Sequence, residues 1–109
     1  MEIYQYLNSG KLLRDQFFEK KQNSPSFSIR AWAKVLGLSS HGPLQQILAG
    51  KRVLPKKYLP AIKKSLNLNQ KQLDYLGILI DFEKSKSEEE KSIYLEKLKK
   101  LRPKNDDVH

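Results

Sequence analysis

Residues 27–52 read FSIRAWAKVLGLSSHGPLQQILAGKR, and this stretch predicts two short helices joined by a tight turn. Ser28 stands where an N-cap is expected, because its hydroxyl can accept a hydrogen bond from an unpaired backbone N–H of the first turn. Phe27 and Trp32 occupy the two positions of a hydrophobic staple around that cap. Gly37 predicts the end of the first helix, since glycine readily adopts the left-handed conformation that follows a helix. The apolar face between these signals consists of Ile29, Trp32, Ala33 and Leu36, which recur at helical spacing.

A second helix is predicted over residues 40–49, with Ser40 as its N-cap. Pro43 is tolerated in its first turn, because the N–H that proline lacks has no intrahelical partner there. Gly50 ends the helix, and two basic residues follow directly. Leu44, Ile47 and Leu48 form the inward stripe, which leaves Gln45, Gln46 and Ala49 facing outward.

The run resembles the repressor/Cro-type (xenobiotic-response-element-like) helix-turn-helix, and the likeness rests on Ser28, Ala33, Gly37-Leu38-Ser39, Ile47 and Gly50-Lys51-Arg52. It is similar in particular to a bacterial regulator subfamily that carries PSFSxRAxAxxLG, here residues 25–37, at the N-terminus of a longer chain. The resemblance implies an all-α fold, a five- to six-helix bundle of the lambda-repressor-like type with a central helix-turn-helix. If the chain is a piece of a longer regulator, the resemblance also implies a C-terminal sensor domain.

A helix-turn-helix of this kind places the N-terminal residues of its second helix against base edges in the major groove. The resemblance therefore implies base contacts from Ser40, His41, Gln45 and Gln46. A glutamine amide can bond N6 and N7 of one adenine together, which discriminates that base from the others. An ordinary solvated helix face is the alternative interpretation of the two glutamines. Phosphate contacts are expected from Arg30, Lys34, Lys51, Arg52 and Lys56, with Arg30 as the substitute for a glutamine that repressor-type domains often carry at the position of Ile29.

The basic charge of the chain is unevenly distributed. The 109 residues carry a formal net charge of +9, with 21 Lys or Arg and 12 Asp or Glu. Residues 1–70 hold 12 of these basic residues and three acids, whereas residues 71–109 hold nine of each. The whole excess therefore lies in the part that contains the two predicted helices, as expected if that part meets a polyanion such as double-stranded DNA. A basic surface that serves solubility is the alternative.

The composition argues against catalysis, metal binding and membrane insertion. The chain has no cysteine and two histidines, so a thiolate site, a histidine zinc site and a Ser-His-Asp triad are not expected. No pattern suggests a cofactor site, or an acid, base and nucleophile that act together, and we expect no enzyme activity. No apolar run approaches the ~20 residues of a membrane span, and the first ten residues lack the pattern of a secretion signal. These features predict a cytoplasmic protein that acts by binding.

The sequence around the motif predicts further helices. Residues 1–68 are expected to form the helix-turn-helix core with an N-terminal supporting helix, which begins at Lys11 after an interruption at Ser9-Gly10. After the motif, a helix is expected from Pro55, and Pro60 should kink or split it.

The last part of the chain reads as a helical pair over residues 69–102 and a tail over residues 103–109. Asn69 and Gln72 are spaced as a capping box for the first helix of the pair. This helix is apolar over much of its circumference, so its surface must be covered. Either the pair packs back on the core, or it forms a homodimer through residues 69–101.

Two functions from different classes fit the sequence. The first is sequence-specific binding of double-stranded DNA, with residues 40–49 in the major groove, as a transcription regulator or the DNA-binding part of one. The second is a protein-interaction module of antitoxin or antirepressor type, which keeps the helix-turn-helix shape without contacting DNA. Binding that ignores DNA and follows the last two helices would distinguish the second from the first.

Overall fold

The computed structural model describes residues 3–103, and all regular structure within that range is helical. Its α-helices are α1 (Ser9–Asn23), α2 (Ile29–Val35), α3 (Gly42–Leu48), α4 (Leu59–Leu66), α5 (Gln70–Lys84) and α6 (Glu88–Leu101). Two short 3-10 helices, η1 (Ile3–Gln5) and η2 (Lys56–Tyr58), precede α1 and α4. The predicted all-α class and the number of helices are confirmed.

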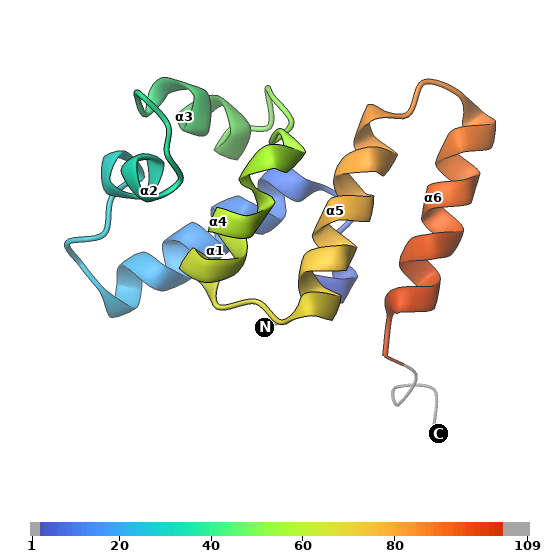
Figure 1. Cartoon of the computed structure of the whole chain (residues 1–109), viewed down its shortest axis with the longest axis horizontal. Coiled ribbons are helices and arrows are strands. Elements are labelled where there is room, and N and C mark those ends of the chain that lie inside the picture. Colours follow the sequence, from blue (N-terminus) through green and yellow to red (C-terminus); the bar gives the residue numbers. More distant parts are fainter. Residues whose placement is uncertain (1–2, 104–109) are drawn as a thin grey trace.

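The helices form a bundle with α2 and α3 at one end and α5 and α6 at the other (Figure 1). α5 lies between α4 and α6 and contacts both, and α5 and α6 run antiparallel side by side. α1 contacts both α3 and α5. The first helix therefore links the two ends of the molecule.

One hydrophobic core receives buried side chains from every α-helix in the described range. Trp32 is fully buried and stacks on Phe17, with the two ring centroids 6.0 Å apart. Its indole N–H donates to the hydroxyl of Ser65 at 3.0 Å. A buried indole N–H without a partner would be costly, so this hydrogen bond allows the tryptophan to fill the core. Trp32 thereby ties α2 to both α1 and α4.

α1 begins at Ser9, two residues before the predicted start at Lys11. The Asn8 side chain caps the helix by accepting from the N–H of Lys11 at 2.8 Å. The Glu83 carboxylate of α5 accepts from the N–H of Ser9 at 2.7 Å and also from its hydroxyl. Negative groups stabilise a helix N-terminus. The predicted interruption at Ser9-Gly10 was therefore wrong. The sequence did not reveal that α1 starts at Ser9, because the carboxylate that stabilises this start lies 74 positions away.

Gly10 lies inside α1 because α3 passes too close for a side chain. A Cβ atom at this position would stand 2.7 Å from the carbonyl oxygen of Ile47 and 3.5 Å from the Cα of Gly50. So close a contact with backbone cannot be relieved by rotating a side chain. The glycine therefore serves the packing of two helices, whereas the sequence suggested that it breaks one.

The helix expected from Pro55 is split, as Pro60 predicted. Pro55 precedes the short helix η2, and α4 begins afterwards at Leu59. Pro60 lies in the first turn of α4, where its missing N–H costs no hydrogen bond. Asn67 ends α4 in the left-handed conformation, with φ 56°.

α5 is capped and covered as its apolar composition requires. Asn69 and Gln72 form the predicted capping box, with hydrogen bonds of 2.8 and 2.9 Å. η1, α1 and α4 contact α5, and α6 contacts it as well. Among the large apolar side chains of residues 69–101, all within the described range, Ile93 alone is exposed. The fully buried side chains of α5 are Tyr75, Leu76, Leu79 and Ile80.

The start and the end of the described chain are joined. The Tyr75 hydroxyl lies 3.0 Å from the carbonyl oxygen of Tyr4 and 2.7 Å from that of Tyr6. Arg102, which follows α6, donates through Nε to the Tyr4 carbonyl at 2.9 Å. Of the expected tail, Pro103 is exposed, and residues 104–109 lie outside the described range.

Replacing Gly10 by alanine should lower the free energy of unfolding by about 1–3 kcal/mol, because the added methyl group overpacks the contact with α3. Gly42→Ala is the matched control, since a Cβ at Gly42 would meet nothing within 4 Å. Urea unfolding followed by circular dichroism measures both variants. Equal stabilities would show that α1 and α3 can separate without cost.

Alkaline titration should reveal the hydrogen bond that the Tyr6 hydroxyl donates to Asp15 Oδ2 at 2.6 Å. This bond, together with burial and the nearby charges of Asp15 and Glu19, raises the pKa of Tyr6 to about 12. An unfolded tyrosine has a pKa of about 10, so the stabilisation is complete below about pH 10 and is lost as the pH rises through about 12. Tyrosinate absorbance should show a late step that Tyr6→Phe removes. Identical titration curves for the two proteins would contradict this assignment.

Candidate nucleic-acid interface

α2 begins as the sequence predicted. The hydroxyl of Ser28 accepts from the backbone N–H three residues on, at 3.0 Å. The rings of Phe27 and Trp32 have centroids 5.9 Å apart and form the expected staple. With Trp32 buried, α2 is held against the core, and Arg30 and Lys34 are exposed on its other side.

The turn after α2 is fixed by a glycine. Gly37 has φ 85°, which a residue with a Cβ rarely adopts. The N–H of Leu38 donates back to the carbonyl of Ala33 at 2.9 Å, a bond typical of helix ends that use such a glycine. Leu38 then packs against the core, and Ala33 is 2% exposed. The predicted glycine turn is confirmed.

The start of α3 differs from the prediction. α3 begins at Gly42, and His41 occupies the N-cap position without a capping hydrogen bond from its side chain. Ser40 was expected to cap the helix, and this was wrong. An N-cap hydroxyl bonds the N–H of the second or third helical residue. The third residue after Ser40 is Pro43, which has no N–H, so one of the two donors is missing and the helix begins only at Gly42. Ser40 is instead exposed, with its hydroxyl free of a capping role.

α3 presents two amide side chains to solvent. Gln45 and Gln46 are exposed and point away from the core, as predicted. The opposite side of this helix is buried, and Ile47 is in backbone contact with Gly10 of α1. The exposed amides therefore stand on a helix that is fixed from behind. The buried side chains of α3 are Leu44, Ile47 and Leu48.

Before α3, basic and hydroxyl side chains share one shallow hollow. Its volume is about 300 Å³, and its lining residues are Arg30, Ala33, Lys34, Leu38, Ser39, Ser40 and His41. The fold thus brings two of the predicted phosphate contacts together with two of the predicted base contacts. Ser39 belongs to this group, although it was predicted only as part of the turn and not as a DNA contact. Its position in the sequence, next to Ser40 and directly after the turn, could have indicated that it lies in the same hollow.

After α3, two further basic residues are exposed. Gly50 takes φ 80°, and the N–H of Lys51 donates to the carbonyl of Gln46 at 2.9 Å. The side chains of Lys51 and Arg52 are exposed, and neither forms an ion pair with a described residue. Basic residues therefore lie beyond both ends of α3.

Lys56 differs from the other predicted phosphate contacts. Its Nζ donates to Asp81 Oδ2 of α5 at 2.9 Å, and the two side chains are 49% and 29% exposed. A carboxylate this close offsets much of the lysine's positive charge. The fold therefore sets Lys56 apart from the exposed basic residues around α3.

Comparison with known proteins identifies no relative: no family model, no curated protein and no solved structure matches this chain. Within residues 3–103, no helix is both long enough and apolar enough to cross a membrane. In the same range, no three His, Asp or Glu side chains gather as metal ligands would. The arrangement of side chains around α3 is thus the main guide to function.

Proposed function

We propose that this chain binds double-stranded DNA sequence-specifically, as a transcription regulator or the DNA-binding part of one, with α3 in the major groove. The observation that carries the proposal is the exposed amide pair Gln45 and Gln46, which is flanked by exposed basic residues beyond both ends of the helix. Amides supply base contacts, and basic side chains supply phosphate contacts. Both kinds of group are exposed on α3 and on the segments next to it.

The length of α3 suits this role. A helix of seven residues spans about 10 Å, which is comparable to the ~12 Å width of the major groove. Arg30 and Lys34 before the helix, and Lys51 and Arg52 after it, can then reach phosphates on the two edges of the groove. Such backbone contacts fix the register of the helix, and the glutamines discriminate between bases.

Sequence discrimination also needs amides held in a defined position. α3 meets this requirement because its inner face is buried and its backbone touches α1 at Gly10. Ser40 and His41 add hydrogen-bonding groups at the start of the helix, where base edges would be nearest. The hydroxyl of Ser40, which caps nothing, is available to the DNA.

The alternative of a helix-turn-helix-shaped protein-interaction module has less support. It would require apolar surface on the last two helices, where Ile93 is the one exposed large apolar side chain of residues 69–101. Most of the exposed side chains around α3 are polar or basic, with Ala49 and Val35 as apolar exceptions, and this favours a polyanion over an apolar protein surface.

The proposal includes action in the cytoplasm as a homodimer. Domains of this type read paired half-sites about one helical turn apart, so two copies must act together. Residues 69–101 are the candidate contact. If the chain is a piece of a longer regulator, a C-terminal sensor domain would complete it.

Changing both Gln45 and Gln46 to alanine should abolish most of the preference for the specific site, because each good amide contact discriminates by about 1–3 kcal/mol. Affinity for unrelated DNA should stay the same, since no positive charge is lost. The measurement is selection of bound sequences from random duplexes, followed by titration of the enriched site and a scrambled duplex. An equal loss of affinity for both duplexes would remove the glutamines from the base contacts.

Changing both Lys51 and Arg52 to alanine should weaken binding to all sequences and reduce the slope of log affinity against log salt by about 0.9 per lost phosphate contact. Arg30→Ala with Lys34→Ala should have the same kind of effect, and Lys56→Ala a smaller one, because Asp81 already pairs with Lys56. Lys84→Ala with Lys86→Ala is the matched control, since it removes equal charge from exposed residues at the end of α5. If the control lowers the salt slope as much as the Lys51 and Arg52 variant does, affinity for DNA depends on the net charge of the protein and not on the surface around α3.

A further inference from the structure

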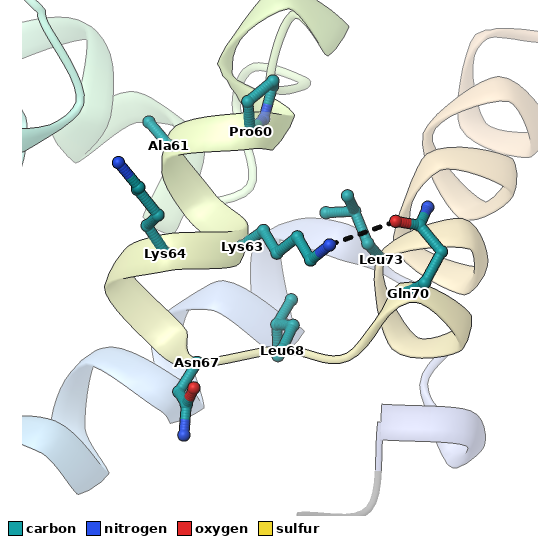
Figure 2. Close-up of a pocket in the computed structure, with 8 residues that line it drawn as sticks. All are labelled: Pro60, Ala61, Lys63, Lys64, Asn67, Leu68, Gln70 and Leu73. Atoms are coloured by element: carbon teal, nitrogen blue, oxygen red, sulfur yellow. Dashed lines mark hydrogen bonds between the residues drawn. The ribbon is translucent and has the colours of Figure 1, made fainter.

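An apolar groove with a basic wall lies between α4 and the start of α5 (Figure 2). Its volume is about 680 Å³. Leu68 and Leu73 contribute apolar side chains from the loop and from α5, and Pro60 and Ala61 contribute them from α4. The lining is completed by Lys63, Lys64, Asn67 and Gln70.

The two walls of the groove differ in charge. Lys63 of α4 donates across the groove to the amide oxygen of Gln70 at 3.1 Å, as Figure 2 shows. The amide nitrogen of Gln70 in turn donates to Asp74 of α5 at 2.8 Å. Lys63 therefore has a neutral partner, and Lys64 beside it is exposed. The α4 wall is therefore positive, whereas the α5 wall is formed by the uncharged Gln70 and Leu73.

The outer face of α6 is complementary to this groove. Ile93 is 56% exposed. Glu89 lies four residues before it and Glu96 three residues after it, so all three share one stripe of the helix. Leu98, on the opposite face, is fully buried in the core. Lys97 and Lys100, four and seven residues after Ile93, border this stripe, and Lys97 Nζ lies 5.4 Å from the centroid of the Tyr94 ring.

The glutamates of this stripe are available to a partner. Glu96 pairs with Lys99 at 3.6 Å, but the two side chains are 67% and 55% exposed, so the pair is weak and easily exchanged. Glu89 is exposed and forms no ion pair with a described residue. Both carboxylates can therefore turn to a new cation.

Within one chain, the stripe cannot reach the groove, because α5 lies between α4 and α6 (Figure 1). We propose that the groove between α4 and α5 is a self-association site, which receives the Glu89-Ile93-Glu96 stripe of α6 from a second copy. Ile93 enters the apolar part of the groove. The two glutamates face Lys63 and Lys64 on the α4 wall.

This contact leaves the DNA-binding surface free. α3 lies at the opposite end of the bundle from α6 in Figure 1, and none of its residues lines the groove. In a two-fold pair, each copy supplies one stripe and one groove, so the interface closes on itself. The inference does not rest on the proposed DNA binding, and the two can fail separately.

Two charge-reversal variants test the inference by sedimentation velocity over the widest accessible concentration range. One carries Lys63→Glu with Lys64→Glu, and the other Glu89→Lys with Glu96→Lys. In each variant alone, groove and stripe have like charges, so the dissociation constant should rise about tenfold or more. In an equimolar mixture, opposite charges face each other again, and association should return to within about threefold of the wild type.

The apolar part of the contact is tested by Ile93→Ser, which should weaken association without affecting the fold. Val35→Ser is its matched control, because Val35 is 60% exposed and belongs to α2, at the opposite end of the bundle from α6 (Figure 1). A wild-type protein that is monomeric at every concentration would overturn the inference and leave the groove to another ligand. Variants that associate like the wild type, or a mixture that does not recover association, would also overturn it. Recovery in the mixture excludes misfolding as the cause of the loss.

Discussion

The contact between Gly10 and the backbone of Ile47 is the constraint on which the candidate interface depends. α3 has seven residues, and an isolated helix of this length is unstable in water. Its position comes from the burial of its inner face and from the close approach of α1. A side chain at position 10 would push the two helices apart and displace the exposed glutamines together with α3. The N-terminus of α1 is itself held by Asn8 and by the distant Glu83.

Local signals in the sequence predicted much of the fold. The cap at Ser28, the turn at Gly37 and the capping box at Asn69 each depend on residues a few positions apart, and all three occur. The predictions at Ser9-Gly10 and Ser40 failed for different reasons. Contacts with Glu83 and Ile47, distant in sequence, turn an apparent helix breaker into part of α1. At Ser40 the failure was local, because the proline three residues on removes one of the two N–H donors that a cap at Ser40 could use.

The candidate site was partly predictable for the same reason. Helical periodicity was enough to place Gln45 and Gln46 outward, since it depends on α3 alone. The pairing of Lys56 with Asp81 was not predictable, because it joins η2 to α5. The position of α5 relative to η2 depends on α4 and on the turn that follows it. The hollow that includes Ser39 needs the turn and α2 in their folded positions. Sequence patterns identify exposed groups, and tertiary structure decides which of them act together.

Counter-charges also decide which basic residues are available to a polyanion. Lys56 is offset by a carboxylate, and Lys20 and Lys57 lie over the rings of Phe27 and Tyr58, 5.4 and 5.3 Å from their centroids. Lys51 and Arg52 have no such partner among the described residues. Lys51 and Arg52, next to α3, therefore remain available to a polyanion, as do Lys11, Arg14 and Lys64 elsewhere in residues 1–70.

The separation of α3 from the α6 stripe matters for affinity. Exposed ion pairs contribute about 0.2–1 kcal/mol each, so an interface built on them is weak in solution. Two domains bound to adjacent half-sites, however, face each other at a high effective concentration, and a weak contact then adds substantially to the affinity for the paired site. This gain requires that both contacts form at once. α3 and α6 lie at opposite ends of the bundle (Figure 1), so the two proposed contacts would not block each other.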